Sequence, residues 1–231
     1  ALIPHLKTNV LDAVYFYGAG CVPDKVPMMY NALSTHLNTK NGIEVNTDML
    51  AVARGLCGHK PGIACIMGTG SNSCFYDGEK IVSNVSPLGF ILGDEGSGAV
   101  LGKLLVGDML KNQMTPELKE KFLNKTGLTP PEIIDRVYRQ PFPNRFLASL
   151  SPFLAENIQE PSVHALVLGS FKAFFQRNVM QYDYKNHPVH FIGSVAYHYQ
   201  DILHEAAREL EIQITTIVKS PMQGLMTFHQ S

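Results

Sequence analysis

Residues 62–73 read Gly-Ile-Ala-Cys-Ile-Met-Gly-Thr-Gly-Ser-Asn-Ser, and this stretch decides the fold class. A short apolar run that breaks into Gly68-Thr69-Gly70-Ser71 predicts a buried strand that ends in a turn. Glycines let a ligand approach the backbone closely, and successive N–H groups together with hydroxyl groups can hold phosphate oxygens. We therefore expect a ligand-binding turn at the end of this strand.

A second glycine-rich segment begins 25 positions after Gly68 and reads Gly93-Asp94-Glu95-Gly96-Ser97. It leads into a helical pattern over 99–111, so Asp94 is expected either to cap that helix or to point into a cleft. Between the two segments, Asp77-Gly78 with apolar flanks predicts a hairpin. Neither segment matches the Walker phosphate loop or the G-x-G-x-x-G dinucleotide fingerprint.

The two segments, at this spacing, resemble the N-acetylglucosamine kinase branch of the actin-like ATPases and sugar kinases. That branch shares its fold and motifs with the ATPase family named after the activators of benzoyl-CoA reductase and 2-hydroxyglutaryl-CoA dehydratase. The resemblance extends along nearly the whole chain. It implies an α/β protein with the actin-like ATPase (ribonuclease H-like) fold, in which two lobes flank a nucleotide cleft.

The polar segment Gly58-His59-Lys60-Pro61-Gly62 is the best position for a crossing between the lobes. We therefore predict a first lobe over residues 1–59, to which residues 221–231 return, and an actin-like second lobe over residues 60–220. Relatives begin with an Asp-Gly-Gly-Gly-Thr-like hairpin whose aspartate holds Mg²⁺, and this sequence contains no such motif. The first lobe is therefore expected to be incomplete, which leaves open whether this polypeptide is active by itself.

Asp48 lies where a short predicted strand over 43–45 meets a predicted helix over 49–57. From the residues alone, a helix N-cap is the simplest interpretation. The resemblance implies another role, because sugar kinases have their catalytic base at this place, ahead of an Ala-rich helix and shortly before the Gly-Thr-Gly turn. Asp48 would then accept the proton of the sugar hydroxyl that attacks the γ-phosphate of ATP.

The resemblance also assigns the other contacts. The phosphates would be bound by Gly68, Thr69, Gly70 and Ser71. The sugar would contact Thr69, Asp94 and Asn46. Gly193 and Ser194, which follow an apolar run over 189–192, would line the adenosine pocket, although close packing of a helix start on a strand explains that glycine equally well from the residues alone.

The implied reaction is the phosphorylation of N-acetylglucosamine or a related amino sugar at its 6-hydroxyl. ATP and Mg²⁺ would be needed, and no protein residue is assigned to the metal. The implied partners are the sugar and ATP. Two lobes that close on these substrates would exclude water and so limit wasteful ATP hydrolysis.

Two other functions stay open. An activator-type ATPase would couple ATP hydrolysis to electron transfer through an iron–sulfur cluster, held by cysteines at a dimer interface. The cysteines are Cys21, Cys57, Cys65 and Cys74. None forms a C-x-x-C pair, so free thiols in a reducing cytoplasm are the simpler interpretation. A non-catalytic sugar-binding module on the same fold is the other alternative, and the presence of both Asp48 and Asp94 argues against it.

The composition is that of an ordinary globular protein, with 45% apolar and 17% charged residues. A formal net charge of -1 supplies no electrostatic reason to expect binding to nucleic acid or to an acidic membrane surface. No apolar run approaches the roughly 20 residues that span a bilayer, and no secretory signal is visible. We expect a cytoplasmic protein, and a homodimer stays open.

Overall fold

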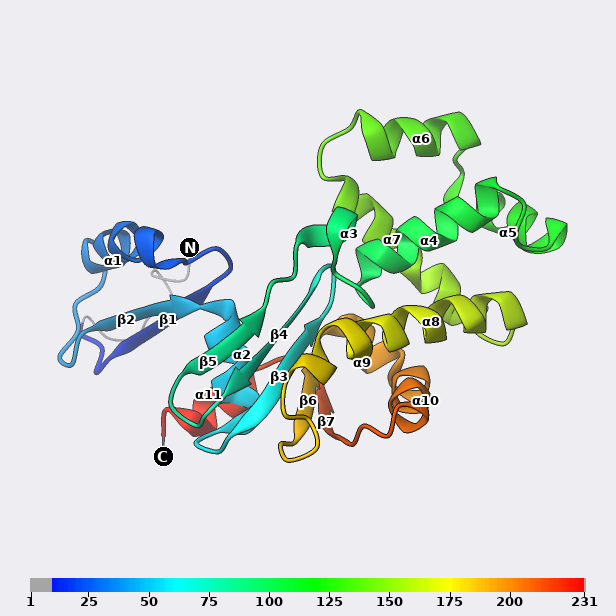
Figure 1. The fold of residues 1–231 in the computed structure, drawn as a ribbon. Coiled ribbons are helices and arrows are strands. Elements are labelled where there is room, and N and C mark those ends of the chain that lie inside the picture. Colours follow the sequence, from blue (N-terminus) through cyan, green and yellow to red (C-terminus); the bar gives the residue numbers. More distant parts are fainter. Residues whose placement is uncertain (1–9, 231) are drawn as a thin grey trace.

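The computed structural model describes residues 10–230, which form a small sheet and a large sheet with helices around the latter (Figure 1). The small sheet pairs β1 (Val14–Gly18) with β2 (Ile43–Thr47) in parallel. The large sheet consists, in spatial order, of β5 (Ile81–Val85), β4 (Ser71–Tyr76), β3 (Gly62–Met67), β6 (Val189–Ile192) and β7 (Ile214–Val218). Strand β3 is antiparallel to β4 and parallel to β6. The predicted strand, turn and strand over residues 62–76 are therefore present.

Strand β3 lies at the centre of the large sheet because it is apolar on both faces. Ile63, Cys65 and Met67 are buried in the main core, whereas Ala64 is buried in a smaller cluster on the opposite face. Strands that are covered on both faces read as continuous apolar runs rather than as alternating patterns. The run over residues 63–67 therefore belongs to a strand between two helical layers.

Helices cover both faces of the large sheet (Figure 1). On one face, α2 (Asp48–Cys57) packs against the strands, and α11 (Met222–Phe228) packs against α2. The main core on the other face includes α4 (Gly98–Leu110), α8 (Pro161–Arg177) and α10 (Gln200–Glu209). The remaining helices are α1 (Val26–Ser34), α3 (Gly89–Leu92), α5 (Pro116–Thr126), α6 (Pro130–Tyr138), α7 (Pro143–Glu156) and α9 (Ser194–His198), with 3₁₀ turns at Pro23–Lys25 and Val179–Gln181.

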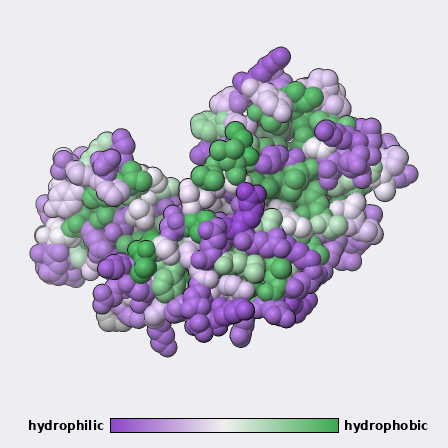
Figure 2. All heavy atoms as spheres, in the orientation of Figure 1, coloured by the Kyte–Doolittle hydropathy of each residue, from purple (hydrophilic) through white to green (hydrophobic). Residues whose placement is uncertain are grey.

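A hollow separates the β1–β2–α1 unit from the helical part of the molecule (Figure 2). Helix α2 joins the two parts, because it follows β2 directly while Met49, Val52 and Ala53 are buried against the large sheet. Residues 1–9 and 231 of the predicted first lobe lie outside the described residues. The proposed boundaries of 1–59 with 221–231, and of 60–220, stay a prediction.

Within residues 10–230, no helix combines the length and the apolar character that crossing a membrane requires.

Candidate active site

The Gly68–Ser71 turn connects β3 to β4 at the carboxyl end of β3. The Gly68 N–H donates to the Gly70 carbonyl at 2.9 Å, which closes the turn, and the Thr69 side chain is exposed. A Cβ built on Gly68 would have no heavy atom within 4 Å, so the space beside this glycine is open. Within the described part of the chain, the N–H groups of Thr69 and Gly70 have no hydrogen-bond acceptor. The turn therefore presents two free backbone donors beside open space.

The start of α4 holds this turn in place. The N–H groups of Gly98 and Ala99 donate to the carbonyls of Gly68 and Thr69, at 2.8 and 3.1 Å. The Ser71 hydroxyl donates to the Glu95 carbonyl at 2.8 Å. The first N–H groups of a helix need partners outside it, and here the turn supplies them. The N–H groups at the start of α4 thus already have acceptors within the protein, whereas the N–H groups of Thr69 and Gly70 remain available to a ligand.

Asp94 lies beside the turn and does not cap α4. The N-cap of α4 is Ser97, whose hydroxyl accepts from the Val100 N–H at 3.2 Å, so the capping alternative for Asp94 is wrong. Asp94 has a left-handed backbone with φ of 55°, and a Cβ built on Gly70 would lie 2.9 Å from the Asp94 Oδ2 atom. A side chain at Gly70 would therefore displace the Asp94 carboxylate from its position beside the turn.

Burial raises the pKa of the Asp94 carboxyl, and the nearby charge of Glu95 acts in the same direction. Backbone N–H groups of Ser71 and Gly89 and the ammonium group of Lys103 act against that rise. Burial disfavours a charged carboxylate, whereas hydrogen bonds to it favour the charge. Asp94 is therefore a partly desolvated acceptor that sits against the glycine turn.

The end of α8 anchors the loop that carries Asp94. Glu95 forms an ion pair with Arg177, 3.0 Å between Oε1 and Nε, and its other oxygen lies 3.5 Å from the Asn178 amide nitrogen. The Gly96 N–H donates to the Ser170 hydroxyl at 3.1 Å. Glu95 was not among the predicted site residues. Its only sequence signal was its position next to Asp94.

Gly193 lies directly against the first turn. Strands β3 and β6 are parallel and Ile66 pairs with Ile192, so their carboxyl ends meet at one edge of the sheet. A Cβ built on Gly193 would lie only 2.3 Å from the Met67 carbonyl oxygen, and φ at Gly193 is 125°. Packing and backbone conformation therefore both require glycine here. Ser194 follows as an exposed residue at the start of α9.

Asp48 is the first residue of α2, and it is exposed. The N-cap is Thr47, whose side chain accepts from the Leu50 N–H at 3.2 Å, so the N-cap interpretation of Asp48 is wrong. The Asp48 Oδ1 atom accepts from the Met49 N–H at 2.9 Å. In the described residues, no hydrogen bond or ion pair links Asp48 or Asn46 to the glycine turns.

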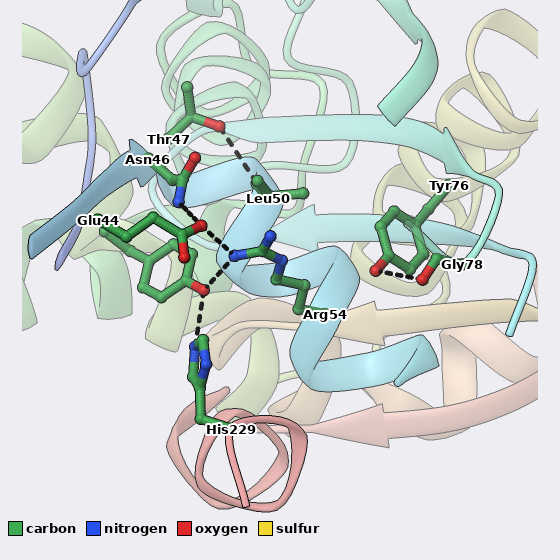
Figure 3. Close-up of polar contacts among 9 residues, drawn as sticks. Glu44, Asn46, Thr47, Leu50, Arg54, Tyr76, Gly78 and His229 are labelled. Carbon is green, nitrogen blue, oxygen red and sulfur yellow. Dashed lines mark hydrogen bonds and ion pairs between the residues drawn. The ribbon is translucent and has the colours of Figure 1, made fainter. Parts of the chain in front are cut away.

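Asn46 belongs to a polar network that the sequence analysis did not predict (Figure 3). Its amide donates to Glu44 at 2.5 Å, and Arg54 donates to the same Glu44 oxygen at 2.7 Å and to the Tyr17 hydroxyl at 2.8 Å. The Tyr17 hydroxyl also lies 2.8 Å from His229 Nε2. Arg54, a charged residue within the mainly apolar α2, was the sequence signal for this network.

The cysteines are free thiols in the structure. Cys65 and Cys74 are fully buried, and burial raises the pKa of Cys57 and of Cys74 to about 12. Cys65 and Cys74 have no exposed surface, so they are not placed to hold a cluster at an interface between two subunits. Within residues 10–230, no three His, Cys, Asp or Glu side chains lie close enough together to hold a metal ion.

Solved structures resemble this chain over nearly its whole length. A candidate N-acetylglucosamine kinase of Porphyromonas gingivalis has a TM-score of 0.93 at 52% sequence identity, covering 99% of this chain and 79% of that one. A candidate N-acetylglucosamine kinase of Chromobacterium violaceum has a TM-score of 0.74 at 20% identity, covering 97% and 78%. A ROK hexokinase of Thermus thermophilus has a TM-score of 0.52 at 12% identity, covering 94% and 78%.

The last two similarities show the fold alone, and together with the first they confirm the predicted actin-like α/β fold. The resemblance to the activator ATPases finds no support among these structures. No protein-family model matches the chain, and no curated protein sequence matches it either.

Proposed function

The chain belongs to the N-acetylglucosamine kinase family, and we propose that it transfers the γ-phosphoryl group of ATP to the 6-hydroxyl of N-acetylglucosamine or a related amino sugar. One observation carries this proposal beyond family membership. The Gly68–Ser71 turn, Asp94 and Gly193 come from distant parts of the sequence and meet at the carboxyl ends of β3 and β6. Ligands of α/β proteins bind at this edge of the sheet.

In this proposal, the first turn binds the phosphates of ATP. The free N–H groups of Thr69 and Gly70 would donate to phosphate oxygens, and the missing side chain of Gly68 would allow them to approach. The adenosine would lie beside Gly193 and Ser194, on the β6 side of the turn. The buried Ser71 hydroxyl is bonded to the Glu95 carbonyl, so its contribution would be to position the turn.

The sugar would lie between the turn and α2. Asp94 would accept hydrogen bonds from its hydroxyl groups, with Thr69 and Asn46 as neighbours. Asp48, exposed at the start of α2, would take the proton of the 6-hydroxyl as that oxygen forms its bond to the γ-phosphorus. The bond from that phosphorus to the bridging oxygen breaks in the same step, and ADP leaves.

Mg²⁺ bound with ATP would neutralise charge on the phosphates. Magnesium in such sites takes most of its ligands from phosphates and water, with one or two carboxylates. We assign none of residues 10–230 as a ligand of Mg²⁺. A cytoplasmic location and a homodimer remain parts of the proposal.

The test is a coupled assay of ADP release by the full-length protein with N-acetylglucosamine, N-acetylmannosamine, glucosamine and glucose. The proposal expects sugar-dependent ADP release with N-acetylglucosamine or another amino sugar, and a product that carries phosphate on the 6-oxygen by NMR. ADP release that does not depend on any sugar would favour an ATPase, and sugar binding without ADP release would favour a binding module.

A further inference from the structure

A cavity of about 570 Å³ is lined by residues of α5, α6 and α7 and of the loops between them. Figure 1 shows these three helices in the helical part of the molecule. None of its lining residues belongs to the glycine turns or to the Asp48 region. Pockets of roughly 300–1,000 Å³, lined mainly by apolar and aromatic side chains with a few polar groups, are typical of small-molecule sites. This cavity has that size and that kind of lining, and the proposed kinase chemistry makes no use of it.

The polar lining of this cavity is cationic. Lys125, Arg136 and Arg145 line it, and no carboxylate does. Lys125 pairs with Glu156, but neither arginine has an ion-pair partner in the part of the chain that the structure describes. The whole chain has a formal net charge of -1, so two uncompensated guanidinium groups at one cavity are a local concentration of positive charge.

Both guanidinium groups lie over phenylalanine rings. The Cζ atom of Arg136 is 5.5 Å from the centre of the Phe146 ring, and that of Arg145 is 4.8 Å from the centre of the Phe142 ring. Cation–π attraction of this kind restrains a guanidinium group over the ring while its N–H groups can still bind a phosphate or carboxylate. The two arginines are therefore ordered in advance for binding an anion.

The backbone at Phe142 is a separate indication. This residue has a left-handed φ of 59°, and 62% of the residue is exposed. A left-handed backbone is costly for a bulky residue, and such strain collects at ligand-binding sites. Burial of the ring in the protein core does not account for this conformation. With this backbone conformation, the Phe142 ring lines the cavity and lies against the Arg145 guanidinium group.

We propose that this cavity binds a small organic anion that combines a phosphate or carboxylate group with a planar apolar part. The anionic group pairs with Arg136 and Arg145 at the rim. The apolar part contacts Phe142, Phe146 and Leu150, which also line the cavity. The site is separate from the one proposed for ATP and sugar, so it stands or falls independently of the kinase assignment.

The test is calorimetric titration of the protein with phenyl phosphate, which has both parts of the proposed ligand. Charge-assisted hydrogen bonds to two arginines are worth at least about tenfold in affinity, so the double variant Arg136→Gln/Arg145→Gln should bind at least tenfold more weakly. Arg139→Gln is the matched control, because Arg139 lies near the end of α6, pairs with Asp135 and does not line the cavity. Its affinity should equal that of the wild type. Phenol and inorganic phosphate, each with one part only, should bind more weakly than phenyl phosphate.

A further variant guards against indirect effects. Arg145→Lys keeps the charge and loses the planar fork, so it should lower the affinity severalfold while the circular dichroism spectrum stays unchanged. Binding of phenyl phosphate at the glycine turn would show as equal affinity in wild type and double variant, together with weaker binding in Gly68→Ala. That result, or no binding by the wild type up to about 10 mM, would overturn the proposal.

Discussion

Two glycines of this protein, Gly68 and Gly193, are required for different physical reasons. Gly68 and Gly193 both follow apolar strands, and in sequence the two turns look alike. A side chain on Gly68 would enter open space, whereas one on Gly193 would collide with the Met67 carbonyl. Gly68 is thus free to serve a ligand, and Gly193 is required by packing between β6 and the first turn.

This contrast predicts opposite results for two alanine variants. Gly68→Ala should leave the melting temperature unchanged and reduce kcat/KM for ATP by roughly tenfold, because a methyl group keeps phosphate away from the free N–H groups. Gly193→Ala should cost about 2 kcal/mol or more of folding stability. Thermal melts with steady-state kinetics measure both. Gly193→Val would disturb the fold for the same reason, so it cannot be used to test nucleotide binding. Equal kinetics of Gly68→Ala and wild type would remove the turn from the phosphate site.

Variants of Asp48 and of its neighbour Thr47 distinguish a catalytic role from helix capping. In Asp48→Asn the Thr47 cap remains and the amide oxygen can still accept from the Met49 N–H, so stability should barely change. Loss of a positioned base should lower turnover by at least about a hundredfold. Thr47→Ala should instead cost about 1 kcal/mol of stability, since it removes the cap. Turnover of Asp48→Asn within a few-fold of wild type would show that the base lies elsewhere.

Replacing Asp94 by asparagine should raise the stability of the fold and weaken the binding of the sugar. Because burial raises its pKa in the folded state, the ionised carboxylate destabilises the fold above that pKa, and the effect disappears as the pH falls below the unfolded value. Asp94→Asn should therefore melt at a higher temperature than wild type at pH 7, with a difference that narrows toward pH 4. Asparagine also tolerates the left-handed backbone. The variant should bind the sugar more weakly, and a lower melting temperature at pH 7 would contradict the prediction.

At the scale of elements, helix termini position the turns. The first residues of α4 bond the carbonyls of the first turn, and residues at the end of α8 hold Glu95 in the second. Neither helix itself presents a predicted catalytic residue. Their contribution is to fix two loops relative to each other, and proximity of the reacting groups depends on such fixation.

Loss of the Glu95 anchor should therefore affect the sugar. Glu95→Gln weakens the pair with Arg177, so the loop with Asp94 becomes less well placed, and KM for the sugar should rise by roughly fivefold or more with a smaller change in kcat. Glu209→Gln is the matched control, because Glu209 pairs with Lys172 elsewhere on α8. It should change neither constant. Equal effects of the two variants would mean that Glu95 only stabilises the fold.

For the whole molecule, the question is what connects the small sheet to the large one. Arg54 of α2 bonds Glu44 and Tyr17 of the small sheet, and its guanidinium lies 5.0 Å from the ring centre of Phe228 in α11. His229 contacts Tyr17 from the same C-terminal segment. Segments from the two ends of the described chain thus meet around one arginine.

Arg54→Met should weaken this connection. It removes the hydrogen bonds from Arg54 to Glu44 and to Tyr17, so that among the described residues Glu44 keeps only the hydrogen bond from the Asn46 amide. This loss should cost about 2 kcal/mol of stability in urea unfolding. The matched control is Lys40→Met, whose pair with Asp12 is fully exposed and should contribute little. Equal midpoints for Arg54→Met and wild type would mean that apolar packing of α2 alone holds the two sheets together.

The elements and turns that depend on neighbouring residues could be predicted from the amino-acid sequence. The apolar run over 62–67, the glycines after it and the Asp77-Gly78 hairpin have local backbone preferences strong enough to predict the strand, turn and strand that are observed. The same local signals placed Gly68 to Ser71, Asp94 and Gly193 at element ends, where ligands bind.

Which residues lie next to one another depends on how the elements pack in three dimensions. Thr47 and Ser97, and not the neighbouring aspartates, cap α2 and α4, because the choice among adjacent capping residues depends on where packing lets each helix begin. The Glu95–Arg177 pair and the Tyr17–His229 contact join residues 82 and 212 positions apart, and no local pattern encodes such pairs. Contacts of this kind form only when the core brings separate elements together, so they follow from burial of the apolar faces of β3 and its helices and not from local sequence.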